Sequence, residues 1–311
     1  MRSQCRTFYR KFFVPLLLFA FCFPAGAQTA APKANAAALR ARLQAKLAEL
    51  HRDGKFPGAT VGVALADGTS FGLATGMSDR EAKTPMRPTD LMLQGSVGKT
   101  YAAALALQLV KEGRIKLDER IETYLGREAW FARLPNAKEI TVRMLLNHTS
   151  GLVRYEFKEQ FTKDLTANVD KVWQPQELIA YILDTKAPFA AGQGWDYSDT
   201  NYIVLGMIIE RVTKKRYYDL VKQRLLQPLK LKDTVPSDGR VIRGLVQGYA
   251  GEGNSFGGTD AMIVNGKFAI NPHDRDIFRR IAELESQVES APTLSRLIEV
   301  RGELLREAQG K

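Results

Sequence analysis

The chain has 311 residues, of which 45% are hydrophobic and 25% are charged, and its formal net charge at pH 7 is +11. These values are typical of a globular protein and exclude a disordered, collagen-like or multi-span membrane chain. No block of lysine and arginine interleaved with aromatic residues is present, so the positive charge does not indicate nucleic-acid binding.

Residues 1–27 have the layout of a secretory signal peptide. Ala25-Gly26-Ala27 offers a small-residue cleavage site, and an apolar run over residues 12–23 precedes it. That run is short for a membrane span, which favours cleavage before Gln28 over an anchor and predicts a periplasmic or secreted protein. The run follows four basic residues and no acidic one, namely Arg2, Arg6, Arg10 and Lys11.

Both cysteines, Cys5 and Cys22, lie in this leader. The mature chain therefore has no disulfide and no thiol chemistry, which excludes a Cys-His hydrolase. Removal of the four basic residues lowers the formal net charge from +11 to +7. A mildly basic exported protein is drawn only weakly to anionic cell-wall or membrane surfaces.

In the N-terminal third of the mature chain, the sequence predicts a helix, a hairpin and a second, longer helix. Residues 28–55 form a flexible lead and then a helix, because leucines recur there at helical spacing. Strands over residues 59–66 and 69–76 flank Asp67-Gly68, which is a hairpin signal. A helix rich in alanine and leucine then spans about residues 96–112.

The remainder of the chain is predicted to be mainly helical. Residues 244–258 are rich in glycine and predict a loop. Residues 273–311 form a charged tail whose apolar stripe at helical spacing predicts two helices that need a partner surface, either the body of this chain or a second copy. Between the long helix and the loop, four short helices are predicted over residues 142–147, 175–183, 201–212 and 217–226.

Ser96 and Lys99 stand at the start of the long helix. A spacing of three puts the hydroxyl and the amine on one helix face, one turn apart. The helix N-terminus stabilises negative charge on the serine oxygen. A partly buried lysine loses proton affinity and can accept a proton or orient a base. A Ser-x-x-Lys match is nevertheless weak by itself, since serine is also a common helix cap.

The same segment ends in Gly98-Lys99-Thr100, which is also found in nucleotide-binding P-loops. The complete motif needs a glycine five positions before Gly98, where this chain has Leu93. An exported protein also meets little ATP. The sequence therefore disfavours nucleotide binding.

Tyr197 precedes the predicted helix over residues 201–212. A tyrosine near a lysine and a serine can act as a general base when the lysine's charge lowers its proton affinity. A tyrosine packed on the core is the alternative. In either case Asp199 is expected to cap the helix that follows.

Three segments occur in the order seen in serine β-lactamases and penicillin-binding proteins. They are Ser96–Lys99, residues 145–152 (Leu-Leu-Asn-His-Thr-Ser-Gly-Leu) and residues 197–202 (Tyr-Ser-Asp-Thr-Asn-Tyr). With a continuous likeness over residues 56–272, the chain resembles this family. Within this family, the chain looks like the branch that contains class C β-lactamases, D-alanyl-D-alanine carboxypeptidases and related esterases.

This resemblance implies an α/β fold of the α+β type, with an antiparallel sheet and a helical domain over residues 56–272. It implies that Ser96 is the nucleophile, Lys99 its activator and Tyr197 the general base. The family usually has Asn where this chain has Asp199, which replaces an amide donor by an acceptor. Asp199 is therefore expected to alter a contact with Lys99 or with substrate.

His148 raises the alternative of a Ser-His-Asp triad. No Gly-x-Ser-x-Gly elbow surrounds Ser96, because Gln94 occupies the first glycine position. The resemblance instead implies a structural role for His148. The other histidines, His51 and His273, are isolated and form no metal-ligand cluster, so neither a metal nor another cofactor is expected.

The family's third motif, Lys-Thr-Gly or His-Thr-Gly, does not follow Tyr197 in this sequence. In the family this motif holds the substrate carboxylate and supplies part of the oxyanion hole. The likeness also ends near Pro272, so the sheet is expected to be incomplete and residues 59–76 to form a two-stranded ribbon with an exposed edge. The sequence leaves open whether the tail covers that edge or is a truncation product.

Two functions follow from these observations. The first is an exported serine hydrolase that forms an acyl-enzyme with a β-lactam, a peptidoglycan peptide or a small ester, with low turnover because the third motif is missing. The second is a catalytically impaired relative that binds a wall peptide or a protein partner.

Overall fold

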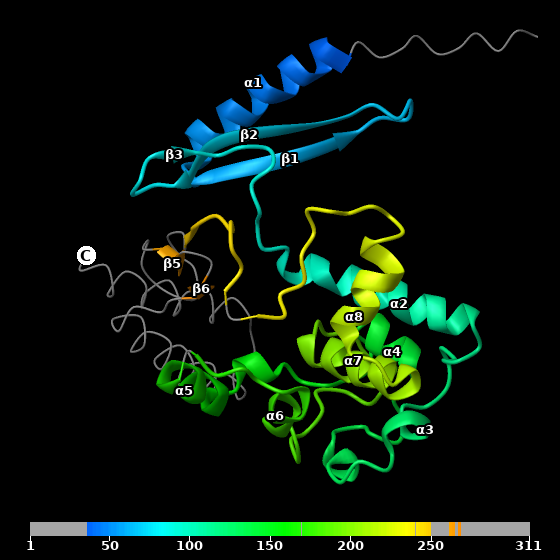
Figure 1. Ribbon diagram of the computed structural model, residues 1–311. Coiled ribbons are helices and arrows are strands. Elements are labelled where there is room, and N and C mark those ends of the chain that lie inside the picture. Colours follow the sequence, from blue (N-terminus) through cyan, green and yellow to red (C-terminus); the bar gives the residue numbers. More distant parts are fainter. Residues whose placement is uncertain (1–35, 169, 240, 250–260, 265–266, 269–311) are drawn as a thin grey trace, which may run out of the picture.

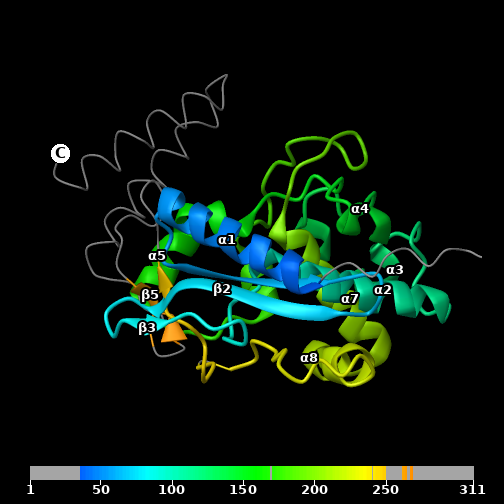
Figure 2. The same ribbon diagram turned by 90° about the horizontal axis from the view of Figure 1, so that it is seen from above.

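The computed structural model describes residues 36–168, 170–239, 241–249, 261–264 and 267–268. The predicted signal peptide and the predicted helical tail over residues 273–311 lie outside these ranges and stay predictions. Figures 1 and 2 show a small antiparallel sheet beside a larger helical body. This mixed architecture confirms the predicted fold class. No helix in the described ranges is both long and apolar enough to cross a membrane.

The first helix, α1 (Ala36–Gly54), covers one face of the N-terminal sheet, with the helical body on the other side of that sheet (Figure 1). Within its leucine stripe Leu47 is buried, whereas Leu50, in the last turn, is 49% exposed. The Gln44 side-chain amide donates to the backbone oxygen of Ala74 at 2.9 Å, which fixes the helix to the second strand.

The N-terminal sheet has the order β1-β2-β3 and consists of β1 (Gly58–Ala64), β2 (Ser70–Asp79) and β3 (Thr84–Pro85). The hairpin prediction is correct: Gly58 pairs with Gly76, and the turn closes through a hydrogen bond from the Thr69 N–H to Asp67 Oδ1 at 2.9 Å. The predicted two-stranded ribbon is wrong, because β3 pairs with the far end of β2. A strand of two residues leaves no periodic pattern in the sequence.

The predicted helix over residues 96–112 is divided into two parts. A short 3-10 turn, η1 (Gly95–Gly98), carries Ser96, and the α-helix α2 (Lys99–Lys111) begins directly after it. The apolar face of α2 is buried in the helical body. Gly113 ends the helix with a φ of +72°, a conformation that glycine adopts without strain.

The core of the helical body is centred on α7 (Asp199–Thr213), in which Val204, Leu205, Ile208 and Ile209 have no exposed surface. This helix contacts α2 and four shorter helices. Short stretches of irregular helix interrupt the chain here, including η3 (Tyr155–Phe157) and a π-type turn, η4 (Lys222–Leu226), where the predicted helix over residues 217–226 changes pitch. The other elements of the body are α3 (Glu122–Leu125), η2 (Phe131–Arg133), α4 (Val142–Leu146), α5 (Glu159–Ala167), α6 (Pro175–Ala180) and α8 (Tyr217–Val221).

A second small sheet joins β4 (Gly248–Tyr249), β5 (Ala261–Val264) and β6 (Lys267–Phe268) in antiparallel order. The predicted loop over residues 244–258 is therefore wrong at β4. The backbone leading into β4 joins the two halves of the molecule, since the Val246 N–H donates to Leu91 O and the Gln247 N–H to Ser78 O, each at 3.0 Å. These pairings are with residues far away in the sequence, so glycine content alone did not reveal them.

Candidate active site

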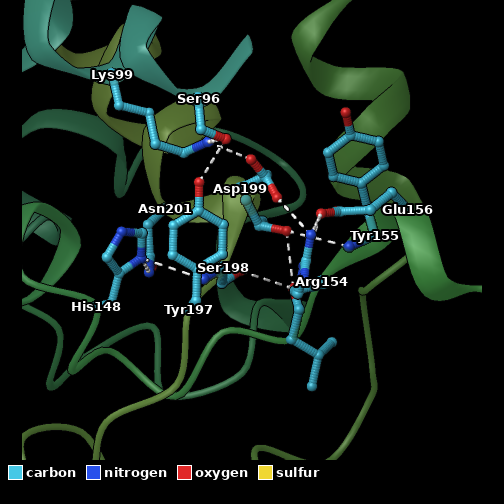
Figure 3. Close-up of polar contacts among 12 residues, drawn as sticks. Ser96, Lys99, His148, Arg154, Tyr155, Glu156, Tyr197, Ser198, Asp199 and Asn201 are labelled. Carbon is cyan, nitrogen blue, oxygen red and sulfur yellow. Dashed lines mark hydrogen bonds and ion pairs between the residues drawn. The ribbon is translucent and has the colours of Figure 1, made fainter. Parts of the chain in front are cut away.

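The structure brings Ser96, Lys99 and Tyr197 together (Figure 3). Ser96 Oγ accepts hydrogen bonds from Lys99 Nζ at 3.2 Å and from the Tyr197 hydroxyl at 2.7 Å. The first two residues come from η1 and α2, and the third from the segment that precedes α7. Ser96 is exposed, so its oxygen is accessible to a substrate.

The local backbone accounts for the position of Ser96. Gly95 has a φ of +52°, and the Val97 N–H donates to Gln94 O at 3.1 Å, so the chain turns sharply before the helix. Ser96 consequently lies at the N-terminal end of α2, where the helix dipole favours negative charge.

Lys99 is a protonated donor in this site. It forms an ion pair with Asp199, and its Nζ lies 4.9 Å from the centroid of the Tyr197 ring. Burial lowers the pKa of Lys99, but hydrogen bonds and charge from Asp199 and Tyr197 outweigh burial, and the net pKa is raised. The carboxylate of Asp199 thus stabilises the ammonium of Lys99 against the effect of burial, and the predicted role of Lys99, as a proton acceptor or as the group that orients a base, stays a prediction.

Asp199 does not cap α7, contrary to the sequence-based expectation. It is the first residue of the helix, Ser198 occupies the cap position, and no side chain caps the helix. Two cations hold the carboxylate instead: Lys99 on one oxygen and Arg154 Nη2 on the other, at 3.1 Å. Burial raises the pKa of Asp199, but hydrogen bonds from Glu156 and Lys99 outweigh it and hold the pKa at about 2. Its predicted contact with substrate stays a prediction.

His148 supports Tyr197. Its ring stacks on the Tyr197 ring with centroids 4.5 Å apart, and its Nδ1 accepts the Ser198 backbone N–H at 3.1 Å. Burial and the nearby charge of Lys99 lower the pKa of His148, which favours a neutral ring. The ring of Trp195 makes an edge contact with that of His148, with centroids 6.3 Å apart, and about two thirds of the surface of Trp195 is exposed.

These contacts give His148 a supporting place in the site, whereas the hydrogen-bond partners of Ser96 are Lys99 and Tyr197. In the part of the chain that the structure describes, no three histidine, cysteine, aspartate or glutamate side chains gather in a way that could hold a metal.

Arg154 and Glu156 belong to the site and were missed in the sequence. Arg154 Nε donates to Glu156 Oε1 at 2.7 Å, and the guanidinium lies 4.1 Å from the Phe157 ring centroid and 5.3 Å from that of Tyr197. Burial, followed by the hydrogen bond to Asp199, raises the pKa of Glu156 to about 7. The only signal in the sequence is that both residues closely follow the His-Thr-Ser-Gly stretch.

A family model described as Beta-lactamase matches residues 40–283. The chain belongs to this family of serine hydrolases, in agreement with the resemblance found in the sequence.

Named relatives differ in their activities. The chain is 31% identical to Esterase EstB of Burkholderia gladioli, over 64% of this chain and 52% of the relative. It is 29% identical to Penicillin-binding protein 4 of Amycolatopsis lactamdurans, over 65% and 51%. The chain thus spans about half the length of these curated relatives.

Solved structures share the fold. A D-stereospecific amidohydrolase from Streptomyces sp. has a TM-score of 0.59 and 30% identity, with 67% of this chain and 60% of that chain covered. A D-amino acid amidase from Ochrobactrum anthropi SV3, in complex with L-phenylalanine amide, has a TM-score of 0.60 and 25% identity, with 76% and 64% covered.

Proposed function

We propose that the protein is an exported serine acyl hydrolase that forms an acyl-enzyme on Ser96 with small amides or esters. The hydrogen bonds from Lys99 and Tyr197 to one exposed serine oxygen are the observation that carries this proposal. Relatives and structural neighbours named esterase, penicillin-binding protein and D-amino acid amidase act on such bonds, which supports the substrate class. Substrates with a carboxylate near the scissile bond, such as a peptidoglycan stem peptide or a β-lactam, are included.

The chemistry proceeds in two steps. In the first step Tyr197 acts as the phenolate, after loss of its hydroxyl proton beside the Lys99 ammonium: Ser96 Oγ attacks the carbonyl carbon, Tyr197 takes the serine proton, and it delivers this proton to the leaving amine or alcohol as the carbon–nitrogen or carbon–oxygen bond breaks, which restores the phenolate. The ammonium of Lys99 lies 3.2 Å from Ser96 Oγ, where it stabilises the negative charge that develops as the proton leaves. Water then hydrolyses the ester on Ser96 and regenerates the hydroxyl.

The direct test is covalent labelling of Ser96. The purified full chain is incubated with a fluorescent fluorophosphonate or penicillin, and the labelled peptide is identified by mass spectrometry. Labelling is expected on Ser96, absent in Ser96→Ala and unchanged in Ser70→Ala, an exposed serine on β2. Absence of label in folded protein, or equal labelling of Ser96→Ala, would refute the proposal.

A binding protein without turnover is the second candidate, favoured by the absence of Lys-Thr-Gly after Tyr197 in the sequence. Steady-state hydrolysis of a chromogenic cephalosporin and of a nitrophenyl ester separates the two. Label on Ser96 with no hydrolysis of either substrate favours binding, and sustained hydrolysis favours the enzyme.

Export rests on the layout of residues 1–27. Expression of the full chain in a Gram-negative host, with N-terminal sequencing of the protein in the periplasmic fraction, tests it. A mature chain that begins at Gln28 is expected. An uncleaved chain in the cytosol would contradict export without affecting the assignment of Ser96.

A further inference from the structure

A continuous row of charged side chains extends from the nucleophile into the helical body (Figure 3). Lys99 lies between Ser96 and Asp199, and Arg154 lies between Asp199 and Glu156, with 3.1 Å from Arg154 Nη2 to Asp199 Oδ2 and 2.7 Å from Arg154 Nε to Glu156 Oε1. Arg154 and Glu156 are linked to Ser96 through Asp199 and Lys99, and Arg154 is linked to it also through the ring of Tyr197.

Aromatic rings, carboxylates and the start of α7 together position Arg154, whose side chain is 29% exposed. Its guanidinium lies against the rings of Phe157 and Tyr197. The backbone on both sides of it is bound to the start of α7, because Thr200 Oγ1 donates to Val153 O at 2.8 Å and accepts the Tyr155 N–H at 3.3 Å. Arg154 thus approaches Asp199 in a geometry set by rigid contacts.

Glu156 has a buried oxygen, Oε2, that no donor reaches in the part of the chain that the structure describes. An ionised carboxylate there would lack a partner, whereas a protonated Oε2 is itself a donor, and Asp199 is the acceptor beside it. The neutral form of Glu156 therefore fits this position.

We propose that Arg154 and Glu156 are positioning residues that hold the Asp199 carboxylate in line with Lys99, and so hold the ammonium of Lys99 on Ser96. The inference rests on the proposed function of Ser96. Arg154 fixes one oxygen of Asp199, and neutral Glu156 donates a hydrogen bond to the same carboxylate. This leaves the other oxygen of Asp199 for Lys99.

Ionisation of Glu156 works against this arrangement. It removes the donor and places a second negative charge beside Asp199, so the two carboxylates compete for one guanidinium. The charged and titratable groups that act on Glu156 are its neighbours Arg154 and Tyr155 and, from α7, Asp199. The pKa of Glu156 is raised to about 7, so the rate of Ser96 acylation is expected to fall as the pH rises through that value.

The experiment measures the rate of Ser96 labelling by a fluorophosphonate from pH 5 to pH 9. Glu156→Gln keeps the shape and an N–H donor at every pH, so its profile is expected to lose the inflection near pH 7. Arg154→Met is expected to label more slowly at all pH values, by roughly 10- to 100-fold, the scale of a slightly misplaced catalytic group. Arg154→Lys is expected to recover part of the rate, because lysine restores the charge but not the planar fork.

The matched control is an exposed Arg–Asp pair elsewhere in the helical body. Arg133 Nη2 lies 2.6 Å from Asp184 Oδ2, and Arg133→Met is expected to leave both the rate and the pH profile unchanged. Thermal unfolding of each variant separates positioning from folding, since a structural role lowers stability without altering the pH profile.

The inference is overturned if Glu156→Gln keeps the wild-type inflection, or if Arg154→Met labels at the wild-type rate. If Arg154→Met does not fold, Glu156→Gln and Arg154→Lys decide the matter. These results are distinct from failure of the proposed function, in which the wild-type protein itself takes no label on Ser96.

Discussion

The helical body and the N-terminal sheet layer differ in how completely their apolar side chains are buried. In the body, the buried core cluster extends from Ala102 to Leu226, and side chains such as Leu205 and Ile208 have no exposed surface. In the sheet layer, Leu47 and Leu73 are buried, but Val61 and Met77 are each 38% exposed. Because every residue of the proposed site stands on the body or at its edge, the site gains its rigidity from the densely packed part.

Specific contacts join the two layers in the part of the chain that the structure describes. Thr60 Oγ1 donates to Met92 Sδ at 3.3 Å, and the segment that leads into β4 pairs with both Leu91 and Ser78. Destabilising substitutions in the body should therefore reduce both stability and the reactivity of Ser96. Destabilising substitutions in the sheet layer should leave the reactivity of Ser96 intact. The expectations below test this difference, from the largest effect to the smallest.

Replacement of Lys99 by Ala should have the largest effect on reactivity. Residues that act as one catalytic unit lose most of the rate when any member is removed, so Ser96 labelling should fall by about 10³-fold or more. Labelling rates of the wild-type chain and of Lys99→Ala provide the measurement, with Ser96→Ala as the unlabelled background. A Lys99→Ala variant that labels at the wild-type rate would show that Lys99 does not activate Ser96.

Leu205→Ala should be the most damaging change to stability. Removal of a fully buried leucine from the centre of α7 leaves a cavity and costs about 2–5 kcal/mol. Because α7 also carries Asp199, the labelling rate should fall together with the midpoint of urea unfolding. A destabilised variant with a wild-type labelling rate would show that the site does not depend on the packing of the body.

Asp199→Asn should change the pH dependence of labelling. The carboxylate of Asp199, together with Tyr197, overcomes the effect of burial and raises the pKa of Lys99, so an amide at residue 199 removes part of this support and should lower the pKa of Lys99. The ammonium is then lost at lower pH, and the alkaline limb of the labelling rate should move in that direction. The profile is best measured in the Glu156→Gln background, which has no carboxyl group at residue 156.

An acid limb that moves instead, with faster labelling at neutral pH, would mean that Lys99 acts as a neutral base. An unchanged profile would mean that Asp199 does not control the charge of Lys99.

Val61→Ala in β1 should have the smallest effect. Val61 is paired with Leu73 but is itself 38% exposed, and substitutions at such positions change stability by about 0.5 kcal/mol or less. Labelling of Ser96 should remain at the wild-type rate. A loss of labelling comparable to that of Leu205→Ala would abolish the distinction between the two layers.

Local patterns account for what the sequence predicted well. The leucine stripe of α1, the Asp67-Gly68 turn and the spacing of Ser96 and Lys99 each depend on residues a few positions apart. Tyr197 was found through its motif, and the structure places its hydroxyl on Ser96.

What the sequence did not predict depends on residues far apart in the chain. Arg154 contacts Asp199, which is 45 positions away in the sequence, and Val246 and Gln247, the two residues before β4, pair with Leu91 and Ser78. The raised pKa of Lys99 could not be predicted for the same reason. Burial of a lysine is suggested by its place in a helix, but the carboxylate that opposes burial comes from α7, 100 positions away.

The aromatic rings near Tyr197 include an exposed tryptophan, Trp195, whose intrinsic fluorescence can be measured. Trp195 lies against His148, which stacks on Tyr197, while Trp130 and Trp173, the other tryptophans, pack beside Phe131 and beside Phe161 and Tyr181. We expect an adduct on Ser96 that displaces Tyr197 to move the His148 ring stacked on it, and so to change the surroundings and the emission of Trp195. Acylation by unlabelled substrates would then be visible in real time.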